Sequence, residues 1–185
     1  IRIKATDPVT SLYGAFGKFL YVNKIQLQDI EKVMLTGVGS AYINEPIYNL
    51  PTEKAEEFIA DGLGARYETK LDRMIVVSMG TGTSIVKCDG EDIKHIGGIG
   101  IGGGTLQGLS RLLLKTDDIL QVAKLAEEGD VSHINLLIKD ISAKPLPGLP
   151  MDAIASLCGN AKSNASREDI AIGLIWMVLQ SICSA

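Results

Sequence analysis

Hydrophobic residues in the first fifty positions form one helical stripe and two short apolar runs. Asp7 followed by Pro8 is typical of a helix start, and the pattern predicts a helix that continues to about Val22. Residues 32–36 form an apolar run followed by a glycine, as a buried strand would, and residues 43–50 predict a second, weaker strand. The apolar stripe of the helix consists of Leu12, Phe16, Phe19 and Leu20.

The middle of the chain predicts a second helix followed by three strands. The Pro-Thr-Glu triplet at residues 51–53 opens the helix, which extends toward Gly64. Residues 73–78 and 84–88 are apolar runs separated by a glycine turn, and each predicts a strand. Asp89-Gly90 is the strongest hairpin dipeptide in the chain, so residues 91–96 are predicted to return as the third strand.

Helical patterns dominate the rest of the chain. Ser166 is followed three positions later by Asp169, as in a capping box, and this last helix is predicted to run to the chain end. The clearest loop is Pro145-Leu146-Pro147-Gly148. The other helical segments are predicted at Leu106 to Leu114 and from Asp117, Ser132 and the region near Met151. Strands and helices with glycine turns between the strands predict an α/β fold.

Composition and charge narrow the possible partners. The chain has 185 residues, of which 46% are hydrophobic and 22% charged, with a net charge of -4. An acidic protein has no general attraction to nucleic acid or anionic lipid, and no apolar run is long enough to span a membrane. Three cysteines without CxxC spacing predict reduced thiols and a cytoplasmic location. The chain opens on Ile1 rather than methionine and does not resemble a signal peptide, so it is expected to begin within a longer protein.

Two glycine clusters carry the candidate chemistry. Gly80, Thr81 and Gly82 lie between two predicted strands, where backbone N–H groups and hydroxyls could hold phosphate oxygens; a plain hairpin turn is the alternative. The second cluster has six glycines among residues 97–104 and precedes a predicted helix, whose start suits an anion; a flexible loop is the alternative. This second cluster is neither a Walker loop nor a good Rossmann fingerprint. Together, about twenty residues apart on one hairpin, they favour a two-sided phosphate cradle.

With these clusters, the chain resembles the type II (eukaryotic-like) pantothenate kinases of the actin-like, sugar-kinase-like ATPase superfamily. The resemblance rests on VVSMGTGTSIV and IGGIGIGGGTLQGLSRLLL, and it extends to LTGVGSAY, EEFIADGLGARY, LAEEGDVSHINLLIKDI, ASLCGNA and SREDIAIGLIWMVLQSI. It implies a two-lobed, ribonuclease H-like kinase fold without its terminal segments. Residues 1–72 would then be the rest of the N-terminal lobe, and residues 73–185 the glycine-rich hairpin and helices of the C-terminal lobe.

The resemblance also implies roles for individual residues. The family's catalytic base is a glutamate placed seven residues before a glycine, and Gly64 and Tyr67 identify that glutamate as Glu57, with Glu56 as its acidic neighbour. Ser84 matches a serine that contacts pantothenate. The residues that match the phosphate and nucleotide loops are Gly80, Thr81, Gly82, Gly102, Gly103, Gly104 and Thr105. No metal ligand is assigned.

Two departures from the family pattern stand out. His95 occupies the position, seven residues before the triple glycine, where the family has an arginine that helps to hold pantothenate or the phosphate. The imidazole is shorter and only partly charged near neutral pH. The family's Asp-x-Gly-Gly-Thr/Ser hairpin is also missing from these residues.

Other residues are expected to have structural roles only. His133 is expected at the surface. The stripe of Leu174, Trp176, Met177 and Val178 is expected in the core or in a dimer surface.

The resemblance implies that ATP and Mg²⁺ serve the conversion of pantothenate to 4'-phosphopantothenate, the first step of coenzyme A synthesis. It also implies a homodimer, an acyl-coenzyme A regulator as a possible partner, and neither a nucleic acid nor a membrane partner. Two alternatives stay open. One is a kinase for another small hydroxylated substrate, and the other is a nucleotide-binding sensor without turnover.

Overall fold

The computed structural model describes Ile1 and residues 7–145 and 147–185. Most of the opening segment, residues 2–6, and Leu146 of the expected proline-rich loop lie outside the described residues. The chain forms two compact units. The first comprises Ile1–Val76 with Val86–Lys94, and the second comprises Val77–Ile85 with His95–Ala185. The division expected between residues 72 and 73 stays a prediction.

A long helix and a two-stranded parallel sheet build the core of the first unit. Helix α1 (Pro8–Asn23) begins as predicted, because the Asp7 carboxylate accepts a hydrogen bond from the Thr10 N–H at 2.6 Å. Strand β1 (Val33–Leu35) pairs in parallel with β2 (Thr52–Lys54). The buried side chains are Val33, Leu35, Ile43 and Ile47, and Leu12, Tyr13 and Phe16 of α1 pack against them. The predicted strand at residues 32–36 is therefore confirmed.

Two predictions for residues 43–64 are wrong. Residues 43–50 contain a 3-10 helix (Ile47–Asn49) instead of a strand, and Tyr48 has a φ of 50°. The helix expected from residue 51 begins six residues later, as α2 (Glu57–Thr69). Residues 52–54 belong to β2 instead, because pairing with β1 outweighs the local helix signal. Two further 3-10 helices span Leu27–Asp29 and Val38–Tyr42.

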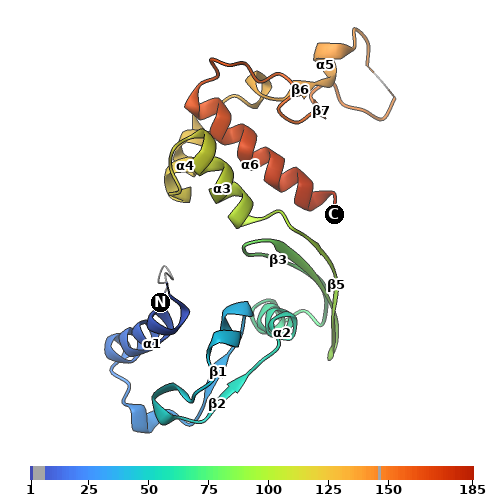
Figure 1. Cartoon of the computed structure of the whole chain (residues 1–185). Helices are drawn as coiled ribbons and strands as arrows, with labels where there is room; N and C mark the ends of the chain where they lie inside the picture. Colours follow the sequence, from blue (N-terminus) through green and yellow to red (C-terminus); the bar gives the residue numbers. More distant parts are fainter. Residues whose placement is uncertain (2–6, 146) are drawn as a thin grey trace. The chain divides into compact units, whose positions relative to one another are not determined.

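Three strands joined by tight turns form the next sheet, as predicted. They are β3 (Arg73–Met79), β4 (Thr83–Asp89) and β5 (Asp92–Ile99), and β4 pairs with both of the others. Figure 1 labels β3 and β5. Gly90 in the turn between β4 and β5 has a φ of 64°, a conformation that glycine adopts without the strain of a side chain. The Asp89-Gly90 hairpin signal is thus confirmed.

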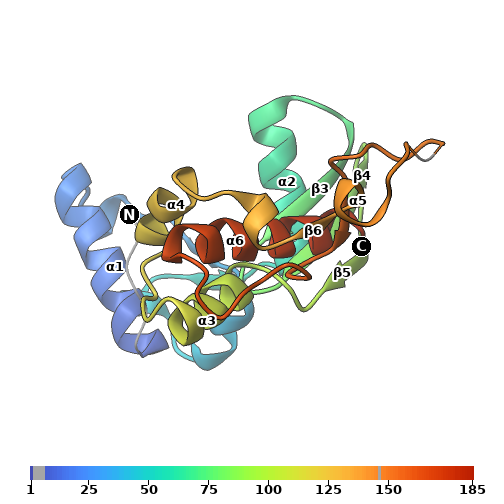
Figure 2. The ribbon, with the colours of Figure 1, turned by 90° about the horizontal axis from the view of Figure 1, so that it is seen from above.

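Helices form most of the second unit. Helix α6 (Arg167–Cys183) lies alongside α3 (Gly103–Leu113) and α4 (Ile119–Glu127), as Figure 2 shows. The buried core between them consists of Leu114, Val122, Ala126, Ala171 and Leu174. Trp176 is 43% exposed, so this member of the expected stripe is not a core residue.

The predicted cap of α6 is half confirmed. Ser166 Oγ accepts the Asp169 N–H at 3.0 Å, but the Asp169 carboxylate accepts the Asp130 N–H at 2.8 Å instead of closing a capping box. The helix expected from Ser132 is only a short 3-10 helix (Val131–His133).

The helix expected near Met151 is wrong, because β7 (Ile154–Ser156) occupies that region and pairs antiparallel with β6 (Leu136–Leu137). A one-turn helix, α5 (Ile138–Ile141), follows β6. The whole is a mixed α/β fold with three small sheets among the described residues.

Candidate functional site

The first glycine loop, residues 80–82, joins β3 to β4 in the second unit. The Gly80 N–H donates to the Gly82 carbonyl at 2.9 Å, so the loop turns tightly. Thr81 at its tip is exposed, whereas Thr83, the first residue of β4, is 6% exposed. The Thr83 hydroxyl donates to the Ile101 carbonyl at 2.8 Å and so ties β4 to the second glycine cluster.

The second glycine loop, residues 100–104, lies directly against the first through backbone hydrogen bonds. The Gly103 N–H donates to the Gly80 carbonyl at 2.8 Å, and the Gly104 N–H donates to the Thr81 carbonyl at 2.9 Å. A Cβ atom at position 102 would lie 2.6 Å from the Gly82 carbonyl oxygen. The two loops therefore form one backbone-bonded unit, in which glycine is required for the close approach.

These contacts change the role that we expect for the start of α3. Gly103 and Gly104 are its first two helical residues, and their N–H groups are among those that a helix start leaves for an anion. Here both donate to carbonyls of the first loop, and the Gly102 N–H donates to Thr105 Oγ1 at 3.3 Å. In this geometry the second loop supports the first, and the phosphate contacts predicted for Gly102, Gly103, Gly104 and Thr105 stay predictions.

The expected base lies in the first unit, at the start of α2. Glu57 is the first helical residue and is half-buried. Glu56 before it is the N-cap, and its carboxylate accepts the N–H groups of Phe58 at 3.3 Å and Ile59 at 2.9 Å. The Glu56 side chain thus has a structural task, because it satisfies two helix donors. Its predicted contact with substrate stays a prediction.

The two expected substrate contacts outside α2 lie on neighbouring strands. Ser84 is half-buried on β4, and His95 is exposed on β5. Gly98 of β5 lies beside Ser84, because a Cβ atom at position 98 would be 3.3 Å from the Ser84 Cα and 2.6 Å from the Thr83 carbonyl oxygen. The sequence analysis gave Thr83 and Gly98 no individual role, although Gly98 belongs to the second glycine cluster; a glycine within a strand is the signal that could have indicated such close backbone approach.

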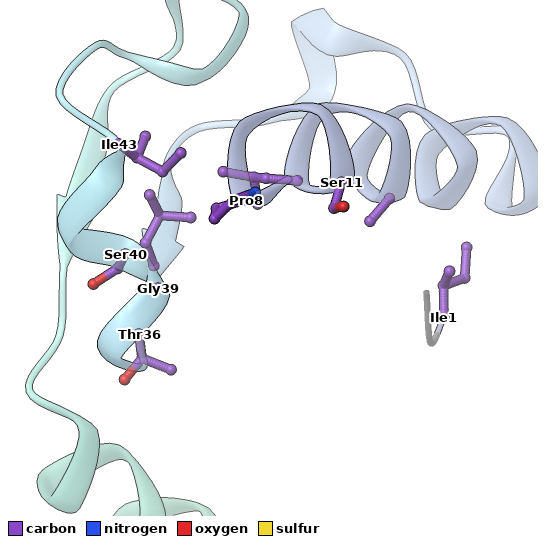
Figure 3. A pocket seen from close by; sticks show the side chains of 10 residues that line it. Ile1, Pro8, Ser11, Thr36, Gly39, Ser40 and Ile43 are labelled. Carbon is purple, nitrogen blue, oxygen red and sulfur yellow. The ribbon is translucent and has the colours of Figure 1, made fainter. Parts of the chain in front are cut away.

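A cavity of about 470 Å³ lies elsewhere in the first unit, between α1 and the segment that follows β1. Figure 3 shows Pro8 and Ser11 of α1 on one side and Thr36, Ser40 and Ile43 on the other. Apart from three hydroxyl groups, its lining is mostly apolar. None of the residues expected in the site lines it.

A smaller polar cavity of about 270 Å³ lies in the second unit at the start of α6. His133 lies at its edge with a largely exposed side chain, and its Nδ1 is 3.1 Å from the Asp169 carboxylate. Three hydrogen bonds hold the pKa of Asp169 below its usual range. The first comes from the Asp130 N–H, and the others come from Ser166 and His133. Asp130 likewise has a lowered pKa, mainly because of the hydroxyl and N–H of Ser132.

Neither a membrane-spanning helix nor a metal-binding cluster occurs among the described residues. No helix in this part of the chain is long and apolar enough to cross a membrane. Within the same ranges, no group of three or more histidine, cysteine, aspartate or glutamate side chains is placed to hold a metal ion. The three cysteines are unpaired, and only Cys88 is buried.

The fold and the paired loops define a mixed α/β protein with a glycine-built double loop on a three-stranded sheet. The Fumble family matches residues 65–185. Type II pantothenate kinases of Staphylococcus aureus strains USA300 and COL are each 37% identical to the chain over 144 residues, which is 75% of this chain and 54% of each relative. The chain belongs to the Fumble family, the family of type II pantothenate kinases. It spans about half the length of the curated relatives that it matches.

Proposed function

We propose that the protein carrying this chain phosphorylates pantothenate with ATP, the first step of coenzyme A synthesis. The observation that supports this most strongly is the backbone-bonded pair of glycine loops in a chain that belongs to this family. Because glycine has no side chain, a ligand can approach the backbone of such loops closely, and this suits a phosphate group whose oxygens accept hydrogen bonds from backbone N–H groups. The actin-like, two-lobed kinase fold, with residues 1–72 in the N-terminal lobe and residues 73–185 in the C-terminal lobe, is part of the same proposal.

In the proposed reaction, the γ-phosphoryl group passes from ATP to the primary hydroxyl of pantothenate. Glu57 accepts the hydroxyl proton as the new O–P bond forms, and ADP leaves with the electrons of the broken bond. The loop formed by Gly80, Thr81 and Gly82 holds phosphate oxygens through the Thr81 and Gly82 N–H groups and the Thr81 hydroxyl, because the Gly80 N–H already donates to the Gly82 carbonyl. The second loop keeps the first in place. Ser84 orients pantothenate. Catalysis then depends mainly on positioning, because phosphoryl transfer needs little other chemistry from the protein.

Magnesium, a homodimer, a cytoplasmic location and an acyl-coenzyme A regulator enter the proposal only through the resemblance. The described residues offer no cage of carboxylates for a metal ion. Magnesium commonly keeps several waters and binds through substrate phosphates, so the ion would arrive with ATP. We assign no step to it.

The test of the base is a Glu57→Gln substitution in the full-length gene product, assayed by coupled ADP release with pantothenate. The amide cannot accept the proton, so kcat is expected to fall about 100- to 10,000-fold with little change in the KM for ATP. Glu53→Gln is the matched control, because Glu53 is exposed on β2 and its carboxylate forms a surface ion pair with Lys32. Undiminished activity of the Glu57 variant would refute the assignment.

His95 favours a second candidate, a kinase for another small hydroxylated substrate. The residue lies exposed on β5 where the resemblance implies an arginine, and an imidazole cannot offer the forked donors of a guanidinium. The same assay with a panel of sugars separates the candidates. Turnover of a sugar but not pantothenate would replace the first proposal, and ATP binding without turnover would indicate a sensor.

A further inference from the structure

Helix α2 is docked on the turn end of the β4–β5 hairpin by a contact that only glycine permits. Gly62 is buried, and a Cβ atom there would lie 2.6 Å from Ile93 Cγ2 and 3.1 Å from Cys88 Sγ. Cys88 is 1% exposed beneath the helix. The backbone of α2 therefore rests on the side chains of both strands at this point, and the helix can tilt about it but cannot move closer.

Arg66, one turn further along the same face of α2, fixes the end of the helix to the same hairpin. Its Nε and Nη2 each lie 3.0 Å from Asp72 Oδ1, and its Nη1 donates to the Gly90 carbonyl at 3.1 Å. The Gly90 N–H in turn donates to the Asp72 carbonyl at 2.8 Å. The guanidinium thus joins three segments: the end of α2, the start of β3 and the β4–β5 turn.

The fork geometry gives Arg66 a role that a simple surface ion pair lacks. An exposed pair contributes little to stability, and Asp72 is 72% exposed. The Arg66 side chain is only 33% exposed, however, and its bond to the Gly90 carbonyl is partly buried. Three donors in one rigid plane restrict the tilt and the rotation of α2 together.

We propose that Arg66 is a positioning residue that holds Glu57 in place through α2, an inference that rests on the proposed function of Glu57 as the base. At about 1.5 Å of rise per residue, Arg66 lies about 6 Å from the Gly62 contact and Glu57 about 7.5 Å on its other side. Gly62 acts as the pivot of this lever. A displacement of about 1 Å at Arg66 therefore moves Glu57 by a similar distance in the opposite direction.

Misplacing a reacting group by about 1 Å can cost about 100-fold in rate. Arg66→Ala should accordingly lower kcat about 10- to 100-fold and leave the KM for ATP within about twofold, because Arg66 is remote in sequence from both glycine loops. Arg66→Lys keeps the charge but not the fork, so it should recover only part of the rate. Arg73→Gln is the matched control, because it removes an exposed ion pair, with 3.2 Å between Arg73 Nε of β3 and Asp89 Oδ1 of β4, and neither residue belongs to α2.

A second measurement reports docking without any turnover. In a Cys158→Ser, Cys183→Ser background, Cys88 is the only thiol of this chain, and α2 covers it. The rate of Cys88 alkylation in the full-length gene product is measured by mass spectrometry of the peptide that contains Cys88. This rate should rise at least fivefold in the Arg66→Ala variant and stay unchanged in the Arg73→Gln variant.

The two measurements separate the possible outcomes. Faster alkylation with a lower kcat and an unchanged KM for ATP supports the proposal. Faster alkylation with an unchanged kcat shows that Arg66 only stabilises the fold, and unchanged alkylation shows that it does not hold α2; either result overturns the proposal. If the unmodified protein fails to phosphorylate pantothenate, the proposed function falls with the positioning role, while alkylation still decides whether Arg66 docks the helix.

Discussion

Replacement of Gly102 by alanine tests whether the two glycine loops form one rigid unit. The added Cβ atom would lie 2.6 Å from the Gly82 carbonyl oxygen, 2.7 Å from its carbonyl carbon and 2.9 Å from its Cα. All three are backbone atoms, so no side-chain rotation can relieve the overlap. The φ of Gly102 is -175°, which any residue adopts, and the cost is therefore steric.

The size of the effect follows from what has to move. Overpacking of a tight site costs about 1–3 kcal/mol. If the loops separate to relieve the overlap, the bonds from the Gly103 and Gly104 N–H groups weaken, each with a net value of about 0.5–1.5 kcal/mol. Separating the loops reduces the overlap but weakens these hydrogen bonds, so part of each cost remains. We therefore expect a loss of about 2–4 kcal/mol in the free energy of unfolding. For a chain of this length, that lowers Tm by about 5–15 °C.

Gly100→Ala is the control within the same loop. No atom lies within 4 Å of its ideal Cβ position, so this substitution should change the free energy of unfolding by no more than about 0.5 kcal/mol. Thermal unfolding followed by circular dichroism gives the stability, and calorimetric titration with ATP gives the Kd. The Gly102 variant should show the lower Tm and the weaker ATP binding. Equal values of Tm and Kd for the two variants would refute the close contact between the loops.

Two further predictions concern the helices of the second unit. Gly129→Ala should lower the free energy of unfolding by about 1–3 kcal/mol, because the new Cβ atom would overlap the Glu168 carbonyl. Gly108→Ala should be neutral or stabilising, because no atom lies within 4 Å of its ideal Cβ position. Thermal unfolding measures both effects. The pKa of Asp169 is lowered in the folded protein, mainly by the Asp130 N–H, so its carboxylate adds stability above about pH 4 that is lost as the pH falls through the lowered pKa. The Tm difference between the unmodified protein and Asp169→Asn should therefore shrink below pH 4, and a constant difference from pH 7 to pH 3 would contradict this.

The sequence predicted elements well where the signal was local. The strands around Asp89-Gly90 form as expected, because a single dipeptide specifies the turn and the apolar runs specify the strands. The start of α6 follows from Ser166 for the same reason. In these cases the residues that decide the conformation lie within a few positions of the element itself.

The failures share a different cause, which is pairing with a distant segment. The Pro-Thr-Glu triplet predicted a helix, but Thr52 pairs with Val33 in the parallel sheet. The Thr52 hydroxyl also accepts the Ile47 N–H at 2.9 Å and donates to the Leu50 carbonyl at 2.9 Å. These bonds stabilise the irregular segment in which a strand was expected. No pattern confined to residues 43–54 reports a partner about twenty residues earlier in the chain.

The same limit applies to the candidate site, where the sequence located the glycines but not what each of them faces. A glycine run before a helix can have either of two physical causes. The missing side chains can make room for a ligand, or they can make room for another segment of backbone. At Gly102 and Gly104 the structure shows the second reason, because their Cβ positions are blocked by Gly82 and Thr81. The carbonyls that receive the Gly103 and Gly104 N–H groups belong to the loop that we propose holds phosphate. These two bonds therefore tie the start of α3 to the first loop, a link between residues more than twenty positions apart that a pattern of glycines alone does not report.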